Sequence, residues 1–371
     1  MKPDVDVLIV GAGPAGAAAA VAARDRGRSV LLVDRATFPR DKLCGGCLTL
    51  RALGAMQRVF ALHPDPATTL TTGHVRLMAG TRVLGDLPDA PPLSMVLRRD
   101  LDAQLWAEAV RRGATPLTAR VEAVDTATPA ITIAGGRTIT AGILIGADGA
   151  TSRIARALHG RPPPMSFALE IEAPPGPDAA VDLDLTAAEA GYGWAFPKTG
   201  SLTLGVGGLA IRNPDLKTAM AAYAARHGVP SDGCKGAFLP AGVVQSGRGR
   251  VLLAGDAAGT CDPVTGEGLA WAMQSGALAG HAAAQALAEG DPARAAKIHT
   301  RAMHRIRAEL FRARLLARAL HHPRLNARFL TLIAASPRLQ RRYLALLAGQ
   351  IDYADIGLAS LWRLLRGLGS A

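Results

Sequence analysis

A glycine-rich turn near the start of the chain has the spacing of a phosphate-binding loop. Gly11-Ala12-Gly13-Pro14-Ala15-Gly16 follows the apolar run Val5–Val10 and opens an Ala-rich segment. Between a strand and a helix, such glycines allow a tight turn, close approach of a pyrophosphate and close packing of helix on strand. The free N–H groups of the helix would face the phosphates. Asp34 ends a second apolar run, where a carboxylate can bind a ribose, so these residues predict a dinucleotide site.

Two later motifs also place a carboxylate directly after an apolar run. They are Gly146-Ala147-Asp148-Gly149 and Gly255-Asp256-Ala257-Ala258, and Gly266-Glu267-Gly268 follows the second. A carboxylate at the carboxyl end of a parallel strand faces the crevice where ligands bind. In the form and order of these motifs, the chain resembles the p-hydroxybenzoate-hydroxylase-like flavoproteins, which bind FAD. The resemblance implies that Asp256 holds the ribityl hydroxyls and that a helix starting near Gly268 directs its positive end at the flavin.

Arg98 stands four residues before Asp102 in a segment similar to one of the same superfamily, where the arginine begins a helix and touches the cofactor. A solvated arginine at a helix start is an equally open interpretation of Arg98, whereas Arg99 is expected at the surface. The sequence has a single dinucleotide fingerprint. We therefore expect NADPH, or another external reductant, to dock only transiently.

The segment Lys42-Leu43-Cys44-Gly45-Gly46-Cys47 follows the second predicted strand. A Cys-x-x-Cys pair can be a redox dithiol or half a zinc site, but neither a thioredoxin-like context nor a second ligand pair accompanies it. The segment resembles the Cys-Gly-Gly segment of the geranylgeranyl reductase family, which runs beside the flavin ring. The resemblance implies that Cys44 and Gly45 lie near the flavin and that Cys44 is the candidate proton donor. A Cys44–Cys47 disulfide stays an alternative, because Cys47 departs from the commoner small or apolar residue.

Aromatic residues are scarce, yet three of them alternate in Gly191-Tyr192-Gly193-Trp194-Ala195-Phe196-Pro197-Lys198. Alternation places Tyr192, Trp194 and Phe196 on one face of a strand. They could form an ordinary sheet core or the floor of a site for a long apolar substrate, and we favour the substrate site. The geranylgeranyl reductase family carries a similar Tyr-x-Trp-x-Phe-Pro segment in its substrate domain.

The resemblance implies an FAD-dependent oxidoreductase that reduces carbon–carbon double bonds of a prenyl or similar long apolar substrate. Hydride would come from the reduced flavin and a proton from a side chain in a dry site. The alternative is an FAD-dependent monooxygenase that hydroxylates a phenolic or polyketide-derived lipid, because one fold hosts both chemistries. The predicted cofactor contacts are Gly11, Gly13, Ala15, Gly16, Asp34, Arg35, Cys44, Gly45, Arg98, Val121, Asp148, Asp256, Gly266, Gly268 and Leu269. The predicted substrate contacts are Gly46, Cys47, Tyr192, Trp194, Phe196 and Pro197, and no metal site is predicted.

The elements that must position these residues fall into two patterns. Continuous apolar runs at 5–10, 29–33, 143–145 and 251–254 predict buried parallel strands of a Rossmann-type α/β unit. Polar–apolar alternation at 74–84, 166–172, 180–185 and 201–206 predicts an inserted antiparallel β-sheet. We therefore expect an FAD-binding domain of residues 1–72, 93–162 and 243–290. A substrate-binding domain would comprise residues 73–92 and 163–242, and a helical C-terminal region would comprise residues 291–371.

The charge of the chain is concentrated in that C-terminal region. The net charge is +12, and residues 291–371 contain 15 of the 42 Lys and Arg but only 4 of the 30 Asp and Glu. Without aromatic residues interleaved with the cations, the pattern argues against nucleic-acid binding. Arginines that flank leucines, as in Trp362-Arg363-Leu364-Leu365-Arg366, favour peripheral contact with anionic lipid as an alternative to simple packing. No apolar run reaches the length of a membrane span and the start resembles a strand, so we expect a cytoplasmic protein.

Overall fold

The computed structural model describes residues 3–160 and 164–356 of the chain. Its larger sheet holds the predicted βαβ unit. The spatial order of this sheet is β17 (Gly247–Arg248), β18 (Val251–Leu253), β11 (Thr138–Gly146), β1 (Val5–Val10), β2 (Val30–Asp34) and β8 (Thr115–Thr118). All neighbours from β18 to β8 are parallel, and β17 is antiparallel to β18. The four predicted apolar runs are therefore confirmed as strands, and their carboxyl ends share one edge.

Helices cover one face of this sheet, and α1 (Pro14–Arg24) packs against both α3 (Arg98–Arg111) and α6 (Leu269–Ala288). Alanines on α1 and α6 are almost completely buried, which brings the two helices close together. The opposite face carries β9 (Val121–Asp125) and β10 (Ala130–Ile133), together with α4 (Arg153–His159). The sequence did not predict β9, β10 or α4.

The second sheet has the order β16 (Lys235–Pro240), β12 (Met165–Ala173), β15 (Ser201–Leu209), β14 (Gly191–Lys198), β13 (Val181–Asp184), β5 (Val75–Ala79) and β6 (Arg82–Leu87). Its pairs are antiparallel except β5 with β13, so the predicted antiparallel sheet contains one parallel contact. The alternating stretch 74–84 is not one strand but a hairpin. The backbone turns at Gly80, whose φ of +63° suits a residue without a side chain.

One face of the second sheet packs against α5 (Leu216–Arg226), with Tyr223 and Met220 buried beneath it. A small third sheet consists of β3 (Cys47–Leu48), β7 (Leu93–Met95) and β4 (Leu70–Thr72). Its strands and α2 (Leu50–Phe60) belong to the chain segments that connect the larger sheet with the second sheet. Short 3-10 turns occupy Ala210–Arg212 (η1), Gly255–Ala258 (η2) and Pro292–Arg294 (η3).

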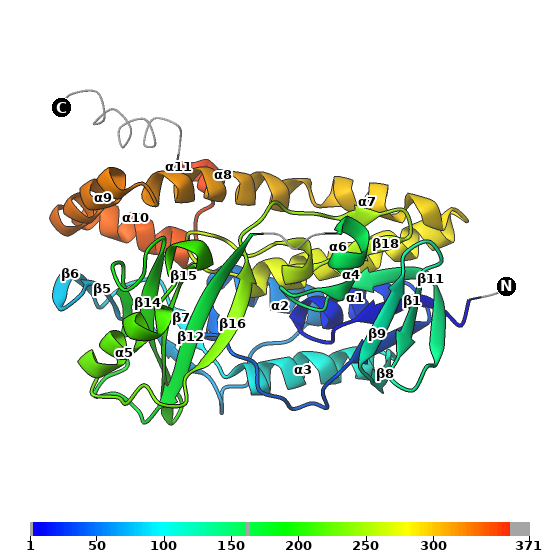
Figure 1. Cartoon of the computed structure of the whole chain (residues 1–371), viewed down its shortest axis with the longest axis horizontal. Helices are drawn as coiled ribbons and strands as arrows, with labels where there is room; N and C mark the ends of the chain where they lie inside the picture. Colours follow the sequence, from blue (N-terminus) through cyan, green and yellow to red (C-terminus); the bar gives the residue numbers. More distant parts are fainter. Residues whose placement is uncertain (1–2, 161–163, 357–371) are drawn as a thin grey trace.

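The C-terminal region is helical where the structure describes it, as predicted. It consists of α7 (Ala295–Ala302), α8 (His304–Leu320), α9 (Pro323–Ala335), α10 (Pro337–Leu347) and α11 (Tyr353–Ile356). These helices run along one side of the molecule, from the larger sheet to the second (Figure 1), because α7 contacts β18 and α9 contacts β6. Within residues 3–160 and 164–356, no helix is long and apolar enough to cross a membrane. The predicted interfacial segment 362–366 lies outside the described residues.

Candidate functional site

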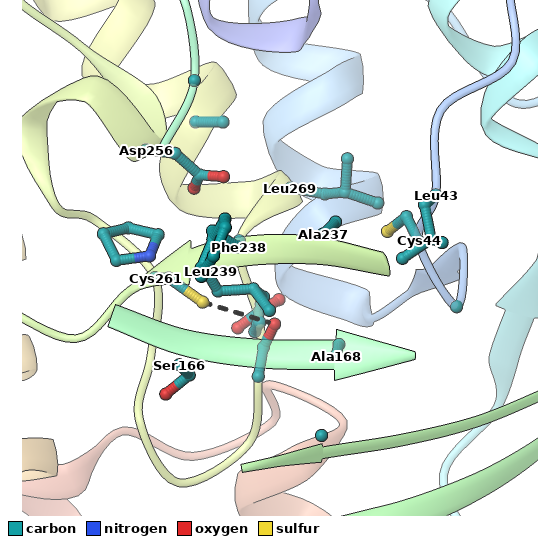
Figure 2. A pocket seen from close by; sticks show the side chains of 18 of the residues that line it. Leu43, Cys44, Ser166, Ala168, Ala237, Phe238, Leu239, Asp256, Cys261 and Leu269 are labelled. Atoms are coloured by element: carbon teal, nitrogen blue, oxygen red, sulfur yellow. Dashed lines mark hydrogen bonds between the residues drawn. The ribbon is translucent and has the colours of Figure 1, made fainter. Parts of the chain in front are cut away.

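A cavity of about 830 Å³ lies among the larger sheet, the second sheet and the C-terminal helices. All the predicted cofactor contacts line it except Gly16, and all the predicted substrate contacts line it except Pro197. Figure 2 shows part of this space, with Cys44 from the loop after β2, Asp256 and Leu269 near the start of α6, and Ser166 and Ala168 from β12 around it. Tertiary folding therefore gathers motifs that are spread over most of the chain.

One end of the cavity is formed around the N-terminus of α1. Gly11, Gly13 and Ala15 line the cavity there, and no side chain caps the helix. The Asp34 carboxylate accepts hydrogen bonds from the N–H groups of Ala12 (2.8 Å) and Ala36 (2.9 Å). These bonds fix the carboxylate, and each oxygen keeps a lone pair for a ribose hydroxyl. The uncapped N–H groups suit a pyrophosphate.

Gly16 acts through packing rather than by touching the cavity. A Cβ atom at this position would lie 1.7 Å from the carbonyl oxygen of Gly11, so any larger residue would push α1 away from the turn. The sequence assigned Gly16 this packing role and also counted it among the cofactor contacts. The structure corrects the second assignment, because Gly16 is absent from the cavity wall.

Asp148 and Asp256 occupy the strand ends where the sequence motifs place them, and both line the cavity. Asp148 accepts hydrogen bonds from the Ser152 hydroxyl (2.5 Å) and the Arg153 N–H (2.7 Å), so it also caps α4. Burial raises the pKa of Asp256 above its usual value, against the opposing charges of Lys42 and Arg98. Because α6 begins at Leu269 without a side-chain cap, its positive end faces the same region as Asp256.

Arg98 is not a solvated residue, so the interpretation of its sequence position as a solvated arginine is wrong, and its contact with the cofactor stays a prediction. Its side chain is 10% exposed, and it donates two hydrogen bonds to Asp102, at 2.6 and 2.8 Å. Asp102 is fully buried and also pairs with Arg40 at 3.1 Å. Burial disfavours the charged guanidinium, but the charge of Asp102 outweighs this effect and raises the pKa of Arg98. Arg99, as predicted, is exposed.

The loop with the two cysteines forms the middle of the cavity wall. Gly46 donates a backbone hydrogen bond to the sulfur of Cys44 at 3.4 Å, and Lys198 from β14 donates one to the carbonyl oxygen of Gly45. Cys44 and Cys47 are both free thiols in this structure, so the disulfide alternative is not adopted. Burial raises the pKa of the Cys47 thiol to about 12, which keeps it neutral.

The aromatic residues of β14 form a continuous surface, as their alternation predicted. Ring centroids of Tyr192 and Trp194 are 5.6 Å apart, and those of Trp194 and Phe196 are 6.3 Å apart. The Tyr192 hydroxyl donates a 2.7 Å hydrogen bond to the carbonyl oxygen of Thr265, in the loop before α6. Pro197 belongs to the same strand but does not line the cavity, since neighbouring residues of a strand point to opposite faces.

The structure adds residues to the site that the sequence did not assign. Helices α9 and α10 close the apolar end of the cavity with Phe329, Leu330, Tyr343 and Leu347. Their helical spacing was visible in the sequence, but it indicated only a buried face and not what that face covers. Tyr353 of α11 does not line the cavity but holds Asp262, which does, because its hydroxyl donates to both carboxylate oxygens of Asp262, at 2.9 and 2.8 Å.

These groups fit FAD. The uncapped N-terminus of α1 lies where phosphates would bind. The carboxylate of Asp34 lies beside it, and that of Asp256 lies near the start of α6. The cavity continues beyond the loop of Cys44, where apolar and aromatic side chains line it. This part leaves room for a second, apolar molecule beside the flavin.

Comparison with known proteins agrees with this arrangement. The chain matches the family described as "Lycopene cyclase protein" over residues 6–355. It is 35% identical to the menaquinone reductase of Mycolicibacterium smegmatis, over 75% of this chain and 76% of the relative. It is 29% identical to the geranylgeranyl diphosphate reductase of Rhodobacter capsulatus, over 78% of this chain and 77% of the relative.

Among solved structures, a geranylgeranyl bacteriochlorophyll reductase-like protein from Thermoplasma acidophilum superposes with a TM-score of 0.77, at 21% identity, covering 92% of this chain and 95% of the other. This likeness shows a shared fold. Together with the match over nearly the whole chain, it shows that the protein belongs to the lycopene cyclase protein family, as an enzyme of the geranylgeranyl reductase-like branch of the FAD-dependent oxidoreductases.

Proposed function

We propose that the protein reduces carbon–carbon double bonds in a prenyl chain of the geranylgeranyl type, or in a similarly long apolar substrate. The observation that carries this proposal is the continuity of the cavity. One end has the helix N-terminus and carboxylates suited to FAD, and the other has the β14 aromatic residues opposite α9 and α10. A long apolar chain could lie on that surface with one double bond at the loop of Cys44.

When bound, reduced FAD supplies a hydride for one carbon of the double bond. The residues of this chain have three further tasks. The N-terminus of α1 and the Asp34 carboxylate hold the adenosine diphosphate half, while Asp256 and the start of α6 hold the other half. Trp194, Phe196 and the facing leucines of α9 and α10 orient the apolar chain and exclude water. A protic side chain near the loop of Cys44 then protonates the second carbon.

The reductant is proposed to be NADPH or another external donor that docks transiently, because the described residues contain one dinucleotide turn. Its hydride would reach the flavin site from the open side of the cavity.

Anaerobic reoxidation of the flavin tests the proposed reaction. The purified protein with FAD is reduced with one equivalent of dithionite, and geranylgeranyl diphosphate, which has no quinone ring to accept the electrons, is added with oxygen excluded. We expect the oxidised flavin absorbance to return and the product to gain two hydrogens by mass. A saturated prenyl alcohol serves as the control, since it has no double bond to reduce.

The same assay also tests the alternative function, that of a monooxygenase. If reoxidation occurs only when oxygen is admitted, and the product gains an oxygen atom, the protein is a monooxygenase and the proposal is wrong. Either result is read from the product mass.

We also propose peripheral contact with an anionic lipid surface through the basic C-terminal region, and the exposed residues of α8 support it. Phe311 is 60% exposed and Leu315 is 41% exposed. They lie one turn apart, between the exposed Arg307 and Arg318 on the same helical face. Apolar residues flanked by arginines are typical of helices that lie in a membrane interface, where a prenyl substrate would reside.

A further inference from the structure

Glu170 is a carboxyl group in a part of the cavity wall that is otherwise small or apolar. Strand β12 presents Ser166, Ala168 and Glu170 to the cavity, because alternate residues share a face. The intervening residues Phe167 and Leu169 pack on the opposite side. On the adjacent β16, Ala237 and Leu239 line the same wall in register with Ala168 and Ser166.

The side chain of Glu170 is deeply buried and incompletely satisfied. Its residue is 6% exposed, and its Oε1 atom has no hydrogen-bond partner within the described residues. The indole N–H of Trp194, on the same wall, interacts with this carboxyl group and lowers its pKa, and it has no other partner within the described residues. Buried polar groups are almost always paired, so a carboxyl group that lines the cavity with only this contact indicates a group that is positioned to meet a ligand.

The charged groups around Glu170 come from several elements. Lys198 of β14 and Lys42 of the cysteine loop are the nearby cations, and Glu172 is the nearby anion on β12. Lys235 is the cross-strand neighbour on β16, and it is exposed. Burial outweighs the two cations and raises the pKa of Glu170 to about 7. A large fraction of the protein therefore holds a neutral, proton-bearing carboxyl group at neutral pH.

We propose that Glu170 donates the proton that completes reduction of the substrate double bond, an inference that rests on the proposed function. In this step the π bond of the alkene breaks and two C–H bonds form. One hydrogen arrives with its electron pair from the reduced flavin, which is oxidised. The other arrives as a proton from the O–H bond of Glu170, and the remaining carboxylate recovers a proton from water after the product leaves.

This assignment separates Glu170 from Cys44, the donor implied by the family resemblance. The Cys44 sulfur accepts a hydrogen bond from the Gly46 N–H and lies beside the Arg98 guanidinium. Those contacts place the sulfur as an acceptor next to a cation, and we assign Cys44 to the packing of the flavin-side loop. Glu170 lines the cavity with the Trp194 indole as its neighbouring donor, and burial favours its proton-bearing form.

The first measurement concerns the protein itself and not its turnover. Infrared difference spectra between pH 5 and pH 9 should show a protonated carboxyl band in the wild-type protein that disappears as the pH rises through about 7. The part of the band that titrates near pH 7 should be missing from Glu170→Gln. Glu172→Gln is the matched control, because Glu172 lies two residues along the same strand, is hydrogen-bonded by Ser201 and Thr203, and does not line the cavity. It should keep the band.

The second measurement is the rate of alkene-dependent reoxidation after anaerobic reduction. In the wild-type protein this rate should be constant below pH 7 and fall above it, because the donor must carry its proton. Glu170→Gln should lower the rate about 100-fold and abolish the pH dependence. Glu170→Asp should restore part of the rate, while Glu172→Gln and Cys44→Ser should keep the wild-type pH profile.

The outcomes distinguish the two proposals. If the wild-type flavin is not reoxidised by any prenyl substrate without oxygen, the proposed function is wrong. If the wild-type protein reacts and Glu170→Gln reacts at the same rate, or if Cys44→Ser alone removes the pH dependence, only the role of Glu170 is wrong. Retained flavin absorbance and an unchanged thermal unfolding temperature at pH 5 show that each variant is folded. If Glu170→Gln fails to fold, a shift of the band in Glu170→Asp assigns it to this position, because Asp148, Asp256, Asp262 and Glu267 are also buried carboxyl groups with raised pKa values.

Discussion

Lys198 donates a hydrogen bond to the carbonyl oxygen of Gly45, which joins β14 to the loop of Cys44. The lysine is buried, and burial lowers its pKa. It is also the cation that most strongly opposes the raised pKa of Glu170. One side chain of the substrate sheet thus fixes the flavin-side loop and influences the proposed proton donor.

The first prediction is therefore that Lys198→Met raises the pKa of Glu170 further. In the variant, the protonated carboxyl band in the infrared spectrum should disappear at a higher pH than in the wild-type protein. It should also lose about 1 to 3 kcal/mol of stability, because the Gly45 carbonyl loses its partner. Lys235→Met is the control, since Lys235 faces solvent. An unchanged titration in Lys198→Met would contradict the coupling.

The second prediction concerns the pH dependence of stability. Folding raises the pKa of Glu170 from 4.5 to about 7. Ionisation of Glu170 therefore destabilises the folded protein, by an amount that grows as the pH rises from 4.5 to about 7 and is constant at higher pH. Glu170→Gln carries no charge. Relative to wild type, its free energy of unfolding should gain up to about 3 kcal/mol at pH 8.5 compared with pH 5. Urea unfolding at the two pH values measures this difference, and equal effects at both would show that Glu170 is not protonated in the folded protein.

The third prediction concerns Arg98. Arg98→Ala removes one of two cations from the fully buried Asp102. It should cost about 2 to 3 kcal/mol of stability, less than the loss of an isolated buried pair because Arg40 remains. It should also weaken FAD binding, measured by titration of the apoprotein. Arg99→Ala, on the adjacent exposed position, should change neither quantity.

The fourth prediction tests the apolar end of the cavity. Leu330→Trp should fill space between α9 and β14 and raise the KM for a long prenyl substrate about tenfold, while the flavin spectrum stays unchanged. Leu332→Trp is the matched control, because Leu332 lies on the same helix and is 38% exposed. If both variants leave the KM unchanged, the substrate does not lie against α9.

The fifth prediction tests lipid contact. The double variant Phe311→Ser/Leu315→Ser should lose co-sedimentation with vesicles that contain anionic lipid, and high salt should weaken the binding of the wild-type protein. Ile211→Ser is the control, because Ile211 is 87% exposed and lies on η1, outside the face of α8 that carries Phe311 and Leu315. Failure of the wild-type protein to pellet at low salt would exclude the proposed contact.

Local patterns determined the cofactor half of the site. The turn at Gly11–Gly16 and the strand ends at Asp34, Asp148 and Asp256 were predictable, because short apolar runs followed by glycine and aspartate dictate strand, turn and helix within a few residues. The alternation of Tyr192, Trp194 and Phe196 determined their common face for the same reason. The helix starts at Pro323 and Pro337 likewise follow from the fixed φ of proline.

Only the tertiary structure decided what these surfaces meet. Glu170 resembles any alternating residue of an exposed strand until β14, β16 and the cysteine loop bury it, and Leu330 is one leucine of an amphipathic helix until α9 closes the cavity. The sequence left Arg98 undecided because burial against Asp102 and Arg40 depends on elements far apart in the chain. Burial and charge pairing depend on these long-range contacts, so the protonation states that carry the proposed chemistry arise only in the folded protein.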